Sequence, residues 1–167
     1  RAQRQFYERV SVSPAQPTPR HHVVTAVRSR ESRHIEHFEK GNRAIVTGHA
    51  IYGRRIENDT LFISADTLFY NEPDSTHSFV KTYNHTKIYK KDLQGLCDSL
   101  TYYIHDSLMS MYNSPILWTN NGQVTAKLIK LTAGQASIKY FELLNNAIVI
   151  QKADSLDEYK FNQIEGK

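Results

Sequence analysis

Alternation of apolar and polar residues is the strongest pattern in the chain, and it runs from Val23 to the end. Segments rich in Tyr, Phe, Ile, Val and Thr are broken roughly every eight to twelve residues by turn-forming groups, for example at 72–74, 120–122 and 145–146. Such segments are typical of β-strands, because β-branched and aromatic side chains fit a pleated, half-buried surface. No stretch longer than about two turns keeps a 3.6-residue apolar period, so the sequence predicts an all-β fold with few, short helices.

A repeat with a period of about 30 residues is visible when the chain is aligned with itself. One half of the repeat unit has a Gly or an Asn at its centre, flanked by apolar positions. These central residues are Gly48, Asn84, Asn113 and Asn145. Gly and Asn tolerate a positive φ, so the sequence predicts a bulge or bend at each of the four positions.

The other half of the repeat unit contains a change in the parity of its apolar positions. Its copies are residues 63–70, 95–102 and 124–131. Small apolar residues precede Asp66, Asp98 or Lys127, and large ones follow. A strand alternates sides strictly, so the change predicts an extra residue or a corner there. Strands that bend at the same place in every repeat can wrap two sheets around one core, which predicts an antiparallel two-sheet β-jellyroll of about ten to twelve strands.

Parity also predicts which side chains face inward. One face of the first half-unit carries apolar residues such as Val46, Met111 and Leu143, whereas the opposite face is mostly polar and carries His49 and His85 at equivalent positions. Stacked repeats should therefore form an apolar interior stripe with a polar outside.

Length and composition favour one domain. With 167 residues and 40% hydrophobic content, the chain has enough apolar residues for a core. Residues 1–22 are rich in proline and have little to bury, so they are expected to be a linker or an extended basic segment, with the domain at 23–167. The chain starts at Arg1 and has no apolar run near the ~20 residues of a membrane span. We therefore expect a fragment of a longer protein, from which any signal or anchor has been removed.

The net charge of +4 is unevenly distributed. Residues 1–40 carry eight Arg or Lys and four acidic residues, whereas residues 41–167 are balanced. Proteins that bind nucleic acid place basic residues along the face that follows the phosphates, so this distribution argues against nucleic acid as a partner.

Residues with catalytic or metal-binding potential do not form a known motif. Cys97 is the single cysteine, which excludes an internal disulfide and a thiolate metal cluster, and it aligns with Ala65 and Ala126 in a small apolar column. Two histidine pairs lack a nearby third ligand, namely His21 with His22 and His34 with His37. The repeated Asp-(Ser or Thr)-Leu tripeptide is typical of turns. No calcium loop, nucleophile elbow, P-loop or dinucleotide fingerprint is present, so the sequence predicts no enzyme activity, metal or cofactor.

The repeat resembles that of the OstA/LptA family of lipopolysaccharide-transport proteins, which combines a bend element with the motif L-x-A-D-x-L-x-Y. Here the motif reads LFISADTLFY at 61–70, and GLCDSLTY at 95–102 looks like its next copy. The segments NSPILW at 113–118 and FNQIEGK at 161–167 resemble the longer OstA-like proteins of Gram-negative bacteria. Lys127 departs from the motif, because it stands where a third copy would carry Asp. The resemblance covers about residues 42–167.

This resemblance implies a two-sheet β-jellyroll, open at both ends, whose apolar trough shields the acyl chains of lipopolysaccharide during export to the outer membrane. It also implies a non-catalytic protein of the periplasm, at or near the outer membrane, that contacts other jellyroll transport proteins head to tail through edge strands. The residues expected to line the trough are Val46, Ala50, Tyr52, Ile63, Leu68, Tyr70, Ile88, Leu100, Tyr102, Met111, Leu117, Ile129, Ala147 and Val149. Tyr140, like Tyr70 and Tyr102, is an aromatic residue suited to lining a trough, although core packing alone would also place these residues in the interior.

Two other classes of function remain open at this point. A structural or assembly module would use the same fold with a filled core and would join protein partners by its edge strands, without a lipid. An enzyme on a repetitive β scaffold, such as a polysaccharide lyase or hydrolase, would need carboxylates or basic residues clustered on one exposed face. Parity does not bring such residues together.

Overall fold

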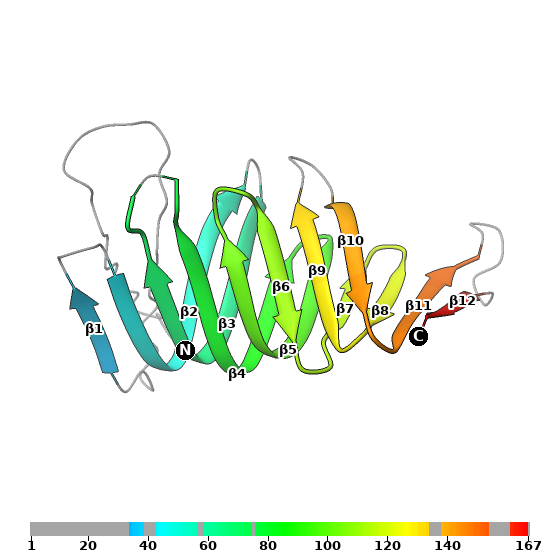
Figure 1. Cartoon of the computed structure of the whole chain (residues 1–167), viewed down its shortest axis with the longest axis horizontal. Coiled ribbons are helices and arrows are strands. Elements are labelled where there is room, and N and C mark those ends of the chain that lie inside the picture. The colour runs from blue at the N-terminus through cyan, green and yellow to red at the C-terminus, as the bar shows by residue number, and fades with distance from the viewer. Residues whose placement is uncertain are drawn as a thin grey trace, which may run out of the picture.

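The computed structural model describes residues 34–38, 43–56, 59–74, 76–133, 138–153 and 161–166. Within these ranges the protein is all-β, and twelve antiparallel strands form one open sheet (Figure 1). The alternation of the sequence is therefore confirmed as strand structure. The segment 1–22, predicted as a linker, lies outside the described residues.

The first five strands follow one another in the sheet, and the sheet then branches at β5. The strands are β1 (His34–Phe38), β2 (Arg43–Ile56), β3 (Asp59–Asn71), β4 (Phe79–Lys90), β5 (Leu93–Tyr103), β6 (Leu108–Tyr112), β7 (Ile116–Thr119), β8 (Gly122–Thr125), β9 (Leu128–Ala133), β10 (Ile138–Leu144), β11 (Ala147–Lys152) and β12 (Phe161–Gly166). The C-terminal half of β5 pairs with β6, whereas its N-terminal half pairs with β7. The sheet divides there into two rows, β6-β9-β10 and β7-β8-β11-β12.

A line of bends crosses the sheet where the repeat predicts it. The four central residues of the repeat have a positive φ: Gly48 (78°), Asn84 (62°), Asn113 (62°) and Asn145 (62°). The residue after each of them also has a positive φ, which the sequence pattern did not indicate; these residues are His49, His85, Ser114 and Asn146. The strand register shifts at the same level, as between Thr47 and Ala50 in β2. Two consecutive left-handed residues turn the strand, so the predicted bends are confirmed.

The corner residues of the other half-unit bond to these bends. Oδ2 of Asp66 lies 2.7 Å from Nδ1 of His85, within hydrogen-bond distance. Oδ2 of Asp98 accepts a hydrogen bond from Nδ2 of Asn113 at 3.0 Å. At the third copy, where Lys127 replaces Asp, the backbone N–H of Lys127 donates to the carbonyl of Asn145 at 2.9 Å. A backbone bond thus takes the place of the missing carboxylate at this bend.

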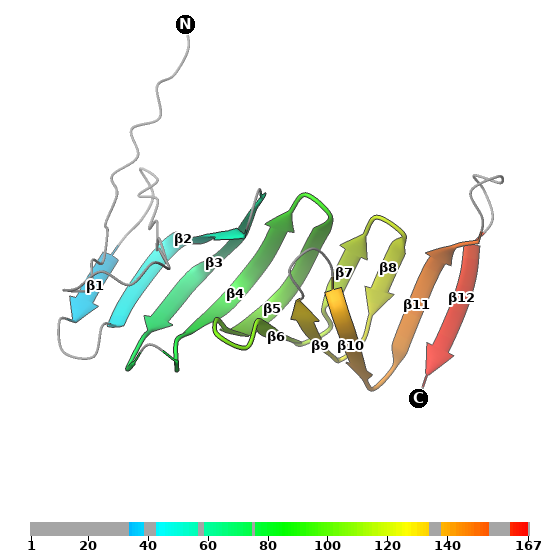
Figure 2. The same cartoon turned by 90° about the horizontal axis from the view of Figure 1, so that it is seen from above.

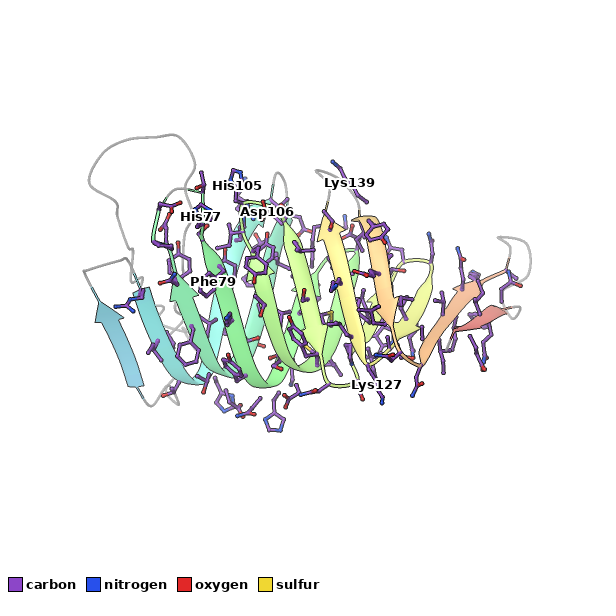
Figure 3. The ribbon with its side chains drawn as sticks, in the orientation of Figure 1. His77, Phe79, His105, Asp106, Lys127 and Lys139 are labelled. Atoms are coloured by element: carbon purple, nitrogen blue, oxygen red, sulfur yellow. The ribbon has the colours of Figure 1, made fainter. Side chains whose placement is uncertain are left out.

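The bends fold the sheet into two arms that face each other. The first arm consists of β1, residues 43–47, 67–71, 79–83 and 99–103, and strands β6, β9 and β10. The second arm consists of residues 50–56, 59–65, 86–90 and 93–97, and strands β7, β8, β11 and β12. Figure 2 shows β9 and β10 of the first arm beside β7 and β8 of the second. In Figure 3, His77, His105 and Asp106 lie at the top, where turns join the ends of the strands. Lys127 lies at the bottom, where the bends connect the two arms.

Rows of apolar side chains from both arms fill the space between them. One row of cross-strand neighbours on the first arm consists of Val46, Leu68, Thr82, Leu100, Met111 and Ile129. The facing row on the second arm consists of Tyr52, Ile63, Ile88, Gly95, Leu117 and Val124. All the residues of both rows are buried and, Thr82 and Gly95 aside, belong to one hydrophobic core. The buried hydroxyl of Thr86 donates to the carbonyl of Asp98 and forms a second hydrogen bond with the hydroxyl of Thr82, so the core's polar groups at this level are satisfied.

Candidate functional site

The interior between the two arms contains the residues that the sequence predicts as a lipid lining. All of them are buried except Ala147 and Val149, which are partly buried and pack against the core. Their inward orientation follows from strand alternation, because each lies in a cross-strand row that faces the other arm. Contact of these residues with a lipid stays a prediction. The expectation for Tyr140 is wrong: its side chain is 61% exposed, because Phe141 and Leu143 occupy the inward positions of β10.

The centre of the interior is filled by the protein's own side chains. Met111 and Leu117, on opposite arms, are both 0% exposed. Gly95 lies between them, and a Cβ added there would stand 3.0 Å from Cε of Met111 and 3.1 Å from Cδ1 of Leu117. The arms are therefore in direct contact at this level, and the glycine permits the close approach.

At the C-terminal end the apolar interior reaches solvent. The first arm ends at β10, whereas the second arm continues through β11 to β12 (Figure 1). Among the described strands, β12 pairs with β11 alone. The row that begins at Tyr52 continues through Val149 to its partner Ile164, which is 64% exposed. Leu143 and Ala147, which face the interior at this end, are also only partly buried. An apolar stripe thus runs from the packed centre to an open end.

At the other end a polar group ties the arms together. Arg54 on the second arm donates from Nη1 to the hydroxyl of Tyr102, near the end of β5 in the first arm, and, at 2.8 Å, to the carbonyl oxygen of Ile104, just after that strand. The guanidinium carbon lies 5.8 Å from the centre of the Tyr102 ring, and Tyr52 packs edge-on against that ring with centroids 6.4 Å apart. Sequence pattern could not predict this group, because its members are about 50 residues apart in the chain.

The residues considered for catalysis or metal binding are separate or buried. In the part of the chain that the structure describes, no group of three or more His, Cys, Asp and Glu could hold a metal ion. Cys97 is buried, and burial raises the pKa of its thiol to about 12, so the reactive thiolate does not form near neutral pH. The corner carboxylates Asp66 and Asp98 lie on different bends and each bonds to the neighbouring strand. The described residues contain no helix that is long and apolar enough to cross a membrane.

Comparison with known proteins identifies no family for this chain. No protein-family model matches the chain, and no curated protein matches it.

Proposed function

We propose that this protein is a non-catalytic β-jellyroll of the OstA/LptA type that holds the acyl chains of lipopolysaccharide on their way to the outer membrane. The observation that carries the proposal is the apolar stripe that leaves the packed centre and reaches solvent over β10, β11 and β12. Apolar surface exposed to water costs free energy, so contiguous apolar patches on a protein surface usually mark a binding site. A carrier needs such an exposed apolar surface to bind an apolar chain.

The proposed mechanism is passive transfer from water to an apolar surface. Each CH₂ group of an acyl chain that is buried contributes about 0.8 kcal/mol, so a chain lying along several strands is held without any covalent step. The proposal places the acyl chains at the open C-terminal end, against Leu143, Ala147 and Val149. Predicted lining residues in the packed centre, such as Ile63 and Leu117, then serve as the core that supports this surface.

The open end also suits a partner of the same architecture. The outer edge of β12 is unpaired among the described strands, and unpaired edges accept further strands. A related jellyroll paired with β12 would extend the second arm and continue the apolar stripe. This head-to-tail contact and the periplasmic location are parts of the proposal.

The proposal is tested by titrating the protein with purified lipopolysaccharide and with its deacylated form. Val149→Asp places a charge on the inward face of β11, and Ile148→Asp is a matched control, because Ile148 is similarly exposed and points to the other face of the same strand. Saturable binding should require the acyl chains and should weaken by about tenfold or more in Val149→Asp. Ile148→Asp should bind normally. Urea unfolding curves establish that both variants fold.

The second candidate is an assembly module that joins proteins by its edge strands. Zero exposure of Met111 and Leu117 favours it, because a filled centre needs no ligand. The same titration separates the two functions. A well-folded protein that binds neither form of lipopolysaccharide would favour the assembly module and contradict the carrier.

A further inference from the structure

A buried hydroxyl without a partner lies at the N-terminal end of the interior. Tyr52 is 1% exposed, and no hydrogen-bond partner is present for its hydroxyl. It is the one such side-chain atom found in the described ranges. Buried polar groups are bonded in the large majority of cases, and an exception costs stability, so it calls for a physical explanation.

An arginine without an anionic partner lies two residues further along the same strand. Strand alternation puts Arg54 on the same face of β2 as Tyr52. Its Nη1 is bonded to a neutral hydroxyl and a neutral carbonyl, on Tyr102 and Ile104, and within the described part of the chain no carboxylate forms an ion pair with it. Partly buried guanidinium groups are usually matched by carboxylate or phosphate oxygens, which accept two hydrogen bonds from the planar fork.

Tyrosine hydroxyls and a guanidinium group meet in this region. The hydroxyl of Tyr70 donates to the carboxylate of Glu72 at 2.8 Å. Burial raises the pKa of Tyr52 and of Tyr102, so both hydroxyls keep their protons at neutral pH; that of Tyr102 accepts from Arg54, and that of Tyr52 has a proton to donate. The group that would complete the site is one that only accepts hydrogen bonds and carries negative charge.

These residues lie on a strand segment whose edge is unpaired among the described strands. β1 pairs only with residues 43–47, so the free edge of residues 50–56 has no partner strand among the described residues. Residues 50–56 are the part of β2 that carries Tyr52 and Arg54, and β2 and β12 lie toward opposite ends of the sheet (Figure 1).

We propose that Tyr52 and Arg54 bind the phosphate or carboxylate group of an amphiphile at this end of the protein. The inference rests on the proposed function, because it needs a protein that binds an alkyl chain. It goes beyond that function by assigning a site for the charged group. Arg54 then exchanges its bonds to the first arm for the ligand's oxygens, and Tyr52 gains the acceptor that it lacks.

The test compares dodecyl phosphate, dodecanol and inorganic phosphate as probes, each titrated below the concentration at which it aggregates. The protein should bind dodecyl phosphate about tenfold or more tightly than dodecanol, because charge-assisted bonds are added to the same chain. Arg54→Gln should remove that difference. Tyr52→Phe should weaken dodecyl phosphate several-fold, leave dodecanol unchanged, and unfold at the same or a higher urea concentration, because it removes the unbonded hydroxyl. The neighbouring Arg55→Gln is the matched control and should behave like the unaltered protein.

Each other outcome overturns a defined part of the proposal. Equal affinity for dodecyl phosphate and dodecanol would overturn the charged-group site while leaving the carrier function in place. Inorganic phosphate bound as tightly as dodecyl phosphate would overturn the assignment to an amphiphile. An unaltered protein that binds neither alkyl probe, nor lipopolysaccharide, would overturn this inference and the carrier function together.

Discussion

Met111→Ala tests whether the centre of the interior is packed. Met111 is fully buried on the first arm between its cross-strand neighbours Leu100 and Ile129, which are also buried. Across the interior its terminal methyl group lies 3.0 Å from where a Cβ on Gly95 would stand. The substitution removes the end of a side chain that has contacts on every side, so it leaves a cavity that solvent does not fill.

The expected loss of unfolding free energy is about 3 kcal/mol, within the range for a buried methionine or leucine replaced by alanine. Leu143→Ala is the control, because Leu143 lies in the same cross-strand row as Ile129 but is only partly buried at the open end. There the loss should be about 1 kcal/mol, because part of the side chain is already in water. The structure thus predicts a difference of about 2 kcal/mol between the two variants.

Equilibrium urea unfolding, followed by circular dichroism, measures both values. Unchanged slopes would show that the two variants unfold to similar states, so that the midpoints can be compared. A loss below about 1 kcal/mol for Met111→Ala, or equal losses in the two variants, would refute the packed centre. The interior would then be an open trough along its whole length.

Three further predictions concern the bends, the cysteine and one turn. Asn84→Ala should lower the unfolding free energy by about 1 kcal/mol, because alanine resists the positive φ of this position, whereas Asn84→Gly should not; equal urea midpoints would contradict this. Cys97 should react with a thiol reagent at pH 8 only after unfolding, because its folded pKa is about 12, and fast labelling of the native protein would speak against its burial. Hydrogen bonds from Thr76 and His77 hold the pKa of Asp74 below its ordinary value. The turn is therefore stabilised above the unfolded pKa of about 3.9 and loses this contribution as the pH falls through the lower folded pKa. An NMR titration of Asp74 with a midpoint at or above about 3.9 would contradict this assignment.

Local chemistry explains what the sequence predicts correctly. A strand follows from alternation because side chains point to opposite faces in turn, and a bend at Gly48 or Asn84 follows from the backbone preference of that single residue. These are properties of a few neighbouring residues. They carry over into any fold that keeps the strands, which is why the rows of buried residues match the predicted interior face.

Features that depend on distant residues were not predictable in this way. Tyr140 shows the limit within one strand: its aromatic character suggested a place in the lining, but Phe141 and Leu143 take the inward positions of β10. The second positive-φ residue of three bends, at His49, His85 and Ser114, was also not predicted, because these residue types adopt that conformation less readily than Gly or Asn; Asn146, in the fourth bend, is of a type that favours it.

The sequence by itself determined the strands, the bends and the inward faces, because each depends on local backbone preference and on a period of two residues. The tertiary structure alone decided how the two arms meet. It divided the sheet at β5, filled the centre around Gly95, left the end at β12 open and brought Arg54 to Tyr102. These outcomes depend on how side chains from separate strands fill a shared volume, and no local pattern in the chain contains that information.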